Sequence, residues 1–387
     1  MSRMDGDSGA ARPRKVVVHR RVPAQRRPRR ARAQRAITGL RRTFTQPGFP
    51  QPSYGPPGFG RSDWLVRTWG GSLAPWRLVA IGVIIILVLA FSWVRLFHIG
   101  PPSVEDLRRA AGVDEWKTLP IGVKDDQPGI AQRDSDGKWS GFDIAIAYMI
   151  AEDLGFRHDD VRFYGIESED RARMEATDPA GNPVPVKMVI ASYSITEDRE
   201  REPNVMFTQS YLHTEQSVIT LAGHPKVASL DEFNHKKVCT LSASTSAKAA
   251  VDSGAVLTGR NRVSECFELL DHRKVDAITT DAAILGGFKA ANPAKYDHWD
   301  LGWDKTEAWG VSVGANAALR DLVNITLYRS FKDPKDARWE QAYAGTIQTE
   351  TVANKTADRR PVPLARPQQP DTTRPRVREL PWEEVLP

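Results

Sequence analysis

The feature that most constrains this chain is an uncharged apolar run, LVAIGVIIILVLAFSWV, over residues 78–94. The run continues past Arg95 to Ile99, so it reaches the lower end of the length that spans a bilayer as a helix. Trp76 and Trp93 lie where interfacial aromatic side chains are common. A cleaved signal peptide is the main alternative, but only a few residues precede the apolar segment of such a peptide. The run therefore predicts a retained transmembrane helix over residues 78–99.

The parts of the chain on the two sides of this helix differ in charge. Residues 1–77 contain 17 arginines and lysines and three aspartates, a net charge of +14, so the rest of the chain carries −8 within the total of +6. Because positive charge stays on the cytoplasmic side, we expect a single-pass protein of the cell membrane with a cytoplasmic N-terminus. Everything after about residue 100 is then extracytoplasmic.

Both ends of the chain have the composition of disordered segments. Residues 1–77 are rich in Pro, Gly and Arg and have no apolar period, so we expect a disordered basic tail. Such a tail can attract anionic lipid, nucleic acid or a cytoplasmic partner, but a topology determinant with a flexible linker is favoured, and we predict no specific nucleic-acid partner. Residues 351–387 are Pro/Arg-rich and are expected to lie outside the fold, with LPWEEVLP at most a docking peptide. Residues 100–113 are expected to be a linker.

The region that follows alternates between strand and helix patterns. TLPIGVKDD, DVRFYGI and VKMVIAS are typical of buried strands, whereas GFDIAIAYMIAEDLGF and SEDRARMEA are typical of helices. This alternation predicts an α/β fold with a mainly parallel sheet. Ligands bind beyond the carboxyl ends of the strands in such sheets, and Ser192, Ser194 and Arg199 follow the third strand in IASYSITEDRER.

A second alternating unit begins at KKVCTLSAS and ends at VDAITTDAAILGGF. Thr245 or Ser246 can cap its first helix, and the free amides at a helix N-terminus attract carboxylates. Asp281 ends the strand VDAITTD, so it lies on the same side of the sheet as that helix start. The sequence therefore predicts two α/β lobes that direct polar groups into a shared cleft.

Seven stretches in order carry a family resemblance. They are IGVKDDQPGI, DGKWSGFDIAIAYMIAEDLGF, IASYSITEDRER, VMFTQSYLHTEQSVIT, KVCTLSASTSAKAA, VDAITTDAAILGGF and WGVSVGANAALRDLVNITLYRSF. From about residue 121 to 348 the chain resembles the type II periplasmic solute-binding proteins for amino acids, bacterial extracellular solute-binding family 3, and most of all their glutamate-binding branch. The resemblance implies a two-lobed clamp, with lobe 1 at 114–222 and 306–350, lobe 2 at 223–305, and hinge crossovers near 220–225 and 303–310.

The resemblance also implies roles for individual residues. Arg199 matches the family arginine that holds the ligand's α-carboxylate, with help from Ser194 and an amide near Thr245, and its planar fork suits that bidentate contact. Asp281 matches the acid that takes the α-ammonium, assisted by Ser192. Lys124 falls where the first lobe meets the ligand side chain, so an acidic side chain fits. These six residues also have ordinary structural alternatives: Arg199 as a solvated surface residue, Asp281 as a helix cap, Lys124 as a strand end with local pairing, and the hydroxyls as turn or cap residues.

The sequence departs from the family pattern in one region. After SEDRARM, the short turn and the Val-Asp pair of the family are replaced by EATDPAGNPVPVKM, with Lys187 where the acid is expected. The loop beside the cleft is therefore longer, and the usual support of the strand that follows is in doubt. Gln127 and Pro128 stand where many members have an aromatic residue, a feature that the glutamate-binding branch shares.

The two cysteines of the chain, Cys239 and Cys266, both fall in the second lobe, one on a strand and one on the helix that returns beside it. An oxidising compartment favours a disulfide between them, and the pair matches cysteines of the glutamate-binding branch. A free core pair and a metal site are the alternatives, but two thiols without neighbouring histidines coordinate zinc poorly. We expect no metal and no cofactor.

No catalytic motif stands out in the sequence, so we expect a binding protein and not an enzyme. The expected ligand is glutamate, aspartate or a related polar amino acid. The expected membrane partner is an ABC permease that receives the ligand, or a signalling membrane protein if the clamp is a sensor. A degenerate surface scaffold that binds no amino acid is the third hypothesis.

Overall fold

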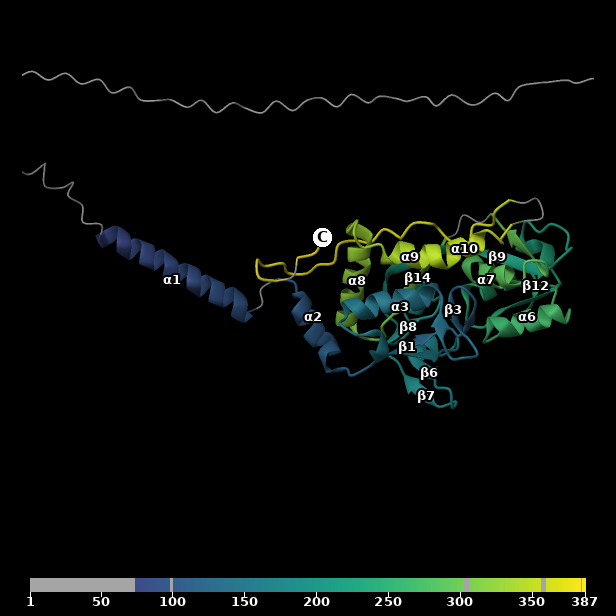
Figure 1. Cartoon of the computed structure of the whole chain (residues 1–387), viewed down its shortest axis with the longest axis horizontal. Helices are drawn as coiled ribbons and strands as arrows, with labels where there is room; N and C mark the ends of the chain where they lie inside the picture. Colours follow the sequence, from purple (N-terminus) through teal and green to yellow (C-terminus); the bar gives the residue numbers. More distant parts are fainter. Residues whose placement is uncertain (1–73, 98–99, 303–305, 356–359, 384) are drawn as a thin grey trace, which may run out of the picture. The chain divides into compact units, whose positions relative to one another are not determined.

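A computed structural model describes residues 74–97, 100–302, 306–355, 360–383 and 385–387 (Figure 1). Most of the expected N-terminal tail, residues 1–73, lies outside the described residues. Helix α1, Ala74–Phe97, contains a span at Pro75–Leu96 with a mean hydropathy of 2.6 that has no part buried inside the protein. This helix is long and apolar enough to cross a membrane, by length and composition.

Residues 100–113 form part of the fold, contrary to the linker expected there. Helix α2, Val104–Ala111, begins at Ser103, whose hydroxyl accepts from the Asp106 backbone while the Asp106 carboxylate accepts from the Ser103 backbone. This reciprocal cap satisfies two otherwise unpaired amides at the helix start. Leu107 and Ala111 are buried, and α2 packs on the later helix α8, Ala317–Lys332.

The main sheet of lobe 1 is built around three neighbouring strands. Strand β1, Leu119–Val123, pairs in parallel with β5, Val161–Gly165, on one side and with β8, Met188–Ile190, on the other. The helices of this lobe besides α2 and α8 are α3, Phe142–Asp153, α4, Glu197–Glu200, and α9, Arg338–Gly345. A small separate sheet consists of β2, Asp126–Gln127, β3, Ala131–Arg133, and β4, Trp139–Ser140. The parallel arrangement matches the expectation from the sequence.

The unusual segment after β5 forms a hairpin at the edge of the sheet. Strands β6, Glu175–Thr177, and β7, Pro183–Pro185, pair antiparallel. The helix expected over SEDRARMEA is wrong, because the chain makes only a short 3-10 turn at Arg171–Arg173. Met174 then takes a left-handed conformation with φ of 55°, which ends the turn and starts the hairpin.

Lobe 2 continues the same sheet in the order β11, β10, β12, β9. Its strands are β10, Lys237–Leu241, β11, Val256–Arg260, β12, Ala277–Asp281, and β13, Tyr296–Asp300. Its helices are α5, Thr245–Asp252, α6, Val263–Asp271, and α7, Ala282–Ala291. The helix–strand alternation expected for this lobe is present in full.

Two strands join the lobes. Strand β9, Phe207–Leu221, pairs with β14, Thr306–Ser312, through residues 207–215 and with β12 and β13 through residues 216–221. Strand β14 also pairs with β8 of lobe 1. The chain therefore passes from one lobe to the other inside β9, a few residues before the boundary expected at 222.

The described residues of the C-terminal part, 351–355, 360–383 and 385–387, pack on the domain, whereas a disordered tail is expected over residues 351–387. Helix α10, Ile347–Thr351, packs on α7, and the segment that follows 360 runs back past α9 toward α8 (Figure 1). Val362, Leu364 and Leu386 are buried. Composition is a poor guide here because a few apolar anchors and backbone hydrogen bonds hold a segment that has no helical or strand period.

Candidate ligand-binding cleft

Arg199 contacts both lobes. It lies on α4, whose first turn is capped by the Thr196 hydroxyl. Its Nη1 donates to the Ser194 carbonyl at 2.7 Å, and its Nη2 donates to the Ala243 carbonyl of lobe 2 at 2.9 Å. The guanidinium lies over the Tyr193 ring, 4.8 Å from the centroid. The side chain predicted from the sequence is therefore buried and faces the opposite lobe, unlike a solvated surface arginine.

Arg171 is a second buried arginine in the cleft, and sequence reasoning missed it. Its Nε donates to the Ser168 carbonyl at 3.1 Å, and its Nη2 reaches the Ala243 carbonyl at 3.5 Å. Its guanidinium lies over the same Tyr193 ring, 4.3 Å from the centroid. Burial, and then repulsion from Arg199, lowers the pKa of Arg171 to about 9. The two guanidinium groups thus share one aromatic ring and one acceptor.

Lys124 adds a third buried cation at the end of β1. Its Nζ donates to the Ser168 hydroxyl at 3.0 Å, and its side chain is buried. Burial, and then the charge of Arg171, lowers the pKa of Lys124 to about 8. Within the described part of the chain, no carboxylate forms an ion pair with Lys124, Arg171 or Arg199. Buried cations without a paired anion are unfavourable, so this side of the cleft is suited to an anionic ligand.

Asp281 lies at the end of β12, as the sequence predicts, and is buried. Its Oδ2 accepts from the Trp309 indole at 2.5 Å. Burial, and then the charge of the neighbouring Glu307, raises the pKa of Asp281 well above its ordinary value, against the opposing effect of Arg199 and Arg171. Asp281 makes no side-chain cap bond to the helix that follows, so the capping alternative is not the role that it has here.

The two serines lie between β8 and α4, where the sequence places them. The Ser192 hydroxyl donates to Gln127 at 2.8 Å, and its backbone amide donates to Asp143 at 2.9 Å. The Ser194 hydroxyl donates to Glu307 of β14. Both hydroxyls therefore have partners inside the protein, and Ser192 takes a left-handed conformation with φ of 48°.

Thr245 is the first residue of α5, but it does not cap that helix. Ser244 is the cap, because its hydroxyl accepts from the Ala247 amide at 3.1 Å. Thr245 instead lines an open hollow between the lobes, together with Thr196 of lobe 1 and Glu307 of β14. Lys124, Arg171, Arg199 and Asp281 do not line this hollow, so a contact between the start of α5 and the ligand stays a prediction.

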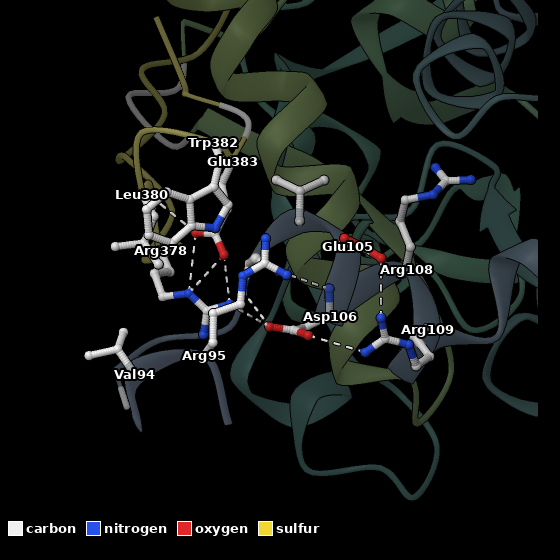
Figure 2. A pocket seen from close by; sticks show the side chains of 12 residues that line it. Val94, Arg95, Glu105, Asp106, Arg108, Arg109, Arg378, Leu380, Trp382 and Glu383 are labelled. Atoms are coloured by element: carbon white, nitrogen blue, oxygen red, sulfur yellow. Dashed lines mark hydrogen bonds and ion pairs between the residues drawn. The ribbon is translucent and has the colours of Figure 1, made fainter. Parts of the chain in front are cut away.

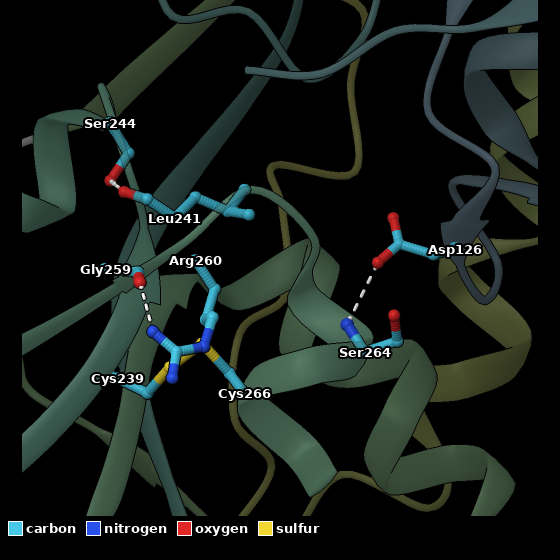
Figure 3. Close-up of a disulfide and its surroundings, with 8 residues drawn as sticks. All are labelled: Asp126, Cys239, Leu241, Ser244, Gly259, Arg260, Ser264 and Cys266. Carbon is cyan, nitrogen blue, oxygen red and sulfur yellow. Dashed lines mark hydrogen bonds between the residues drawn. A yellow bond between two sulfur atoms is a disulfide. The ribbon is translucent and has the colours of Figure 1, made fainter. Parts of the chain in front are cut away.

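Side chains on one flank hold the lobes together. Arg262 at the start of α6 forms an ion pair with Asp125 of lobe 1 at 2.7 Å. Beside it, the Ser264 amide donates to Asp126 at 2.9 Å, the contact drawn at the right of Figure 3. These contacts join residues of the two lobes, so the lobes touch each other on this side of the cleft.

Cys239 of β10 and Cys266 of α6 form a disulfide, which confirms the expected pairing (Figure 3). The bond ties the helix that carries Arg262 to the central strand of lobe 2. Among the described residues, no group of three or more His, Cys, Asp or Glu side chains is arranged to hold a metal ion.

Two α/β lobes that share one sheet, joined by two crossing strands, define the fold of type II periplasmic amino-acid-binding proteins. A solved structure of an ancestral arginine-binding protein bound to glutamine is 26% identical and aligns with a TM-score of 0.52 over 59% of this chain and 97% of that one. The family model of bacterial extracellular solute-binding proteins, family 3, matches residues 119–346, and this chain belongs to that family.

Named relatives include amino-acid-binding proteins and, at 22–23% identity over 45–46% of their own length, membrane-bound lytic murein transglycosylase F of Pseudomonas species. The glutamate-binding protein GluB of Corynebacterium efficiens is 28% identical over 225 residues, which cover 55% of this chain and 74% of that protein. The ABC transporter glutamine-binding protein GlnH of Bacillus subtilis is 28% identical over 245 residues, which cover 62% of this chain and 84% of that protein. The family match and these relatives support an amino-acid solute-binding protein.

Proposed function

We propose that this chain binds an acidic amino acid, glutamate or aspartate, between its two lobes. The observation that carries the proposal is the cluster of Lys124, Arg171 and Arg199, three buried cations whose described hydrogen-bond acceptors are neutral. A dicarboxylate supplies two anionic groups to this cluster, and charge-assisted hydrogen bonds to carboxylates are about twice as strong as neutral ones. The glutamate-binding relatives in Corynebacterium support the same choice of ligand.

The roles of the individual groups follow from their positions. The α-carboxylate takes the place of the Ala243 carbonyl as the acceptor for Arg199, and the α5 amides near Thr245 complete its partners. The α-ammonium lies against Asp281 and Glu307, with Ser192 and Ser194 nearby. Arg171 and Lys124 then receive the side-chain carboxylate. Because these groups come from both lobes, the ligand favours the closed clamp through its contacts with each lobe.

Calorimetric titration of the full chain in detergent micelles tests this proposal. Glutamate or aspartate should bind with a dissociation constant on the order of micromolar, as for a ligand with several charge-assisted contacts. Arg199→Ala should weaken binding about 100-fold. Arg201→Ala is the matched control, because Arg201 is exposed and its ion pairs within the described residues are with Glu197 and Asp198 on its own turn. A folded protein that binds none of the amino acids would contradict the proposal and favour the hypothesis of a surface scaffold that binds no amino acid.

Lys124→Met tests the choice between acidic and amide side chains. The substitution should weaken glutamate binding by about 10-fold or more and leave glutamine binding nearly unchanged, because only glutamate places a charge beside Lys124. An equal effect on both ligands would contradict the proposed recognition of an acidic side chain.

We further propose that α1 anchors the binding domain outside the membrane and that the clamp is not an enzyme. The partner in this proposal is an ABC permease, which the name of the Bacillus relative supports. Deletion of the gene should then reduce glutamate uptake. Unchanged uptake with an altered cellular response to glutamate would instead support a sensor that signals to a membrane partner.

A further inference from the structure

After α9, the chain crosses between the lobes again. Asn354, just after α10, is fully buried in lobe 2. Its Nδ2 donates to the Gly286 carbonyl of α7 at 2.9 Å, and its Oδ1 lies 2.6 Å from Nδ1 of His298 on β13. The chain just after α10 is therefore fixed to lobe 2, although α9 before it packs on α3 of lobe 1.

The segment that follows returns over the two crossing strands. The Thr214 hydroxyl of β9 donates to the Leu364 carbonyl at 2.6 Å, and the Arg366 amide donates to the His213 carbonyl at 2.8 Å. The Arg366 guanidinium donates to the Thr306 hydroxyl of β14 at 2.8 Å. Leu364 thus contacts β9, and Arg366 contacts both strands of the hinge.

Leu364 also packs the returning segment against lobe 2. Its side chain is buried against α7, where a Cβ built on Gly286 would lie 2.7 Å from the Leu364 methyl groups. The bare backbone of Gly286 therefore makes room for Leu364. This close fit attaches the returning segment to lobe 2 as well as to the hinge.

The segment then runs along lobe 1 to the residues next to α1 in the chain. Gln369 donates to the Leu327 carbonyl of α8 at 2.9 Å, and Thr373 and Gln209 exchange hydrogen bonds through their backbone and side-chain groups. The Arg378 amide donates to the Pro102 carbonyl at 3.0 Å. Figure 2 shows the Arg378 guanidinium between Glu383 and Asp106 of α2, at 2.7 and 3.1 Å.

We propose that residues 360–378 form a strap that limits the opening of the lobes and couples their movement to α2. The strap is held by lobe 2 at Leu364, by the hinge strands at Arg366 and by α2 at Arg378. A clamp with two crossing strands opens by twisting those strands, and the strap restrains that twist because it is bonded to both. Since Pro102 lies five residues beyond the end of α1, the strap connects the clamp to the segment that follows the apolar helix. The coupling to ligand rests on the proposed function, whereas the restraint on opening does not.

The restraint is tested without ligand by measuring distances between spin labels on the two lobes of the full chain. Labels at Ala180→Cys in lobe 1 and Lys274→Cys in lobe 2 suit this purpose, because both positions are exposed and the native cysteines are joined in a disulfide. Leu364→Ala combined with Arg366→Ala should broaden the distance distribution at least two-fold. The matched control, Arg376→Ala, changes an exposed residue of the same segment and should leave the distribution as in the parent chain. Equal widths in the strap variant and the parent chain would overturn the proposal.

The coupling to α2 is tested by hydrogen exchange of residues 102–111 with and without glutamate, with binding measured separately by calorimetry. Glutamate should slow the exchange of α2 amides several-fold in the parent chain and in Arg376→Ala, but not in Arg378→Ala, which should still bind glutamate. Binding that leaves α2 unchanged in the parent chain, or changes it equally in Arg378→Ala, would overturn the coupling. Absence of calorimetric binding would overturn the proposed function instead, and the spin-label result would still decide the restraint.

Discussion

Glu350, on α10, lies where the backbones of the two lobes approach one another. A Cβ built on Gly129 of lobe 1 would lie 1.7 Å from its Oε1, and one on Gly287 of lobe 2 would lie 3.2 Å away. Its Oε2 is buried and has no hydrogen-bond partner among the described residues. Burial raises the pKa of Glu350 to about 8, so the carboxyl group is mostly protonated and neutral below that pH.

We expect the free energy of unfolding to fall as pH rises from about 4.5 to 8. The folded state keeps its proton on Glu350 up to about pH 8, whereas an unfolded glutamate loses it near 4.3, so the unfolded state binds fewer protons across that window. The stabilisation from Glu350 is complete below the pKa of the unfolded state and is lost as pH rises to the pKa of the folded state. Glu350→Gln should make this decrease in the free energy of unfolding smaller, by about a few kcal/mol at most.

Urea denaturation at pH 5 and pH 8 measures this slope. A smaller slope remains in Glu350→Gln, because burial raises the pKa of Asp143 to about 7 and that group titrates in the same window. Glu340→Gln is the control, because Glu340 is exposed on α9. A slope in Glu350→Gln as steep as in the parent chain would show that Glu350 is ionised in the folded protein.

Arg171 shows where sequence reasoning failed at the scale of a single residue. In SEDRARMEA it has the pattern of a solvated helix face, and no local signal marks it as buried. Its burial depends on the Tyr193 ring and on the Ala191 and Ala243 carbonyls, which lie on other elements. By contrast, Arg199 was found because a family motif surrounds it.

At the scale of elements, the disulfide between β10 and α6 should contribute strongly to the stability of lobe 2. The cysteines are separated by 27 residues, and closing a loop of that length removes about 3.5 kcal/mol of unfolded-state entropy. The double variant Cys239→Ala, Cys266→Ala should lower the free energy of unfolding by roughly this amount. Chemical denaturation of the variant and of the parent chain gives the difference, and a loss below about 1 kcal/mol would contradict this expectation.

Helix α7 approaches lobe 1 through glycine. A Cβ on Gly287 would lie 1.9 Å from the Pro128 carbonyl oxygen, so the lobes must move apart to accept Gly287→Ala. We expect this substitution to lower the melting temperature and to weaken ligand binding. Gly345→Ala, on α9, is the matched control, because no atom lies within 4 Å of its built Cβ, and it should be neutral or stabilise by up to about 1 kcal/mol. Equal melting temperatures for the two variants would show that the Pro128 contact is absent.

For the whole molecule, we expect the ion pair between Arg262 and Asp125 to favour the closed clamp. Arg262→Ala should shift the distances between the lobes to larger values and weaken glutamate binding by at most about five-fold, because a partly exposed ion pair contributes about 1 kcal/mol or less. Spin-label distances and calorimetry measure the two effects. Arg273→Ala, on the exposed surface of lobe 2, should change neither. A shorter distance or tighter binding in Arg262→Ala would show that the pair favours the open state.

The sequence by itself determined the alternation of strands and helices, the family, the position of Asp281 at the end of a strand, the importance of Arg199 within its family motif, and the apolar helix. These features depend on local periodicity and on motifs that are contiguous in the chain. Tertiary structure alone decided that Arg171 is buried in the cleft, that α2 packs on α8, and that the described residues after 360 pack along the domain. Arg171 depends on acceptors 20 and 72 residues away, and α2 and α8 are separated by most of the domain. The C-terminal segment depends on a few isolated anchors such as Leu364. None of these contacts produces a periodic pattern in the sequence.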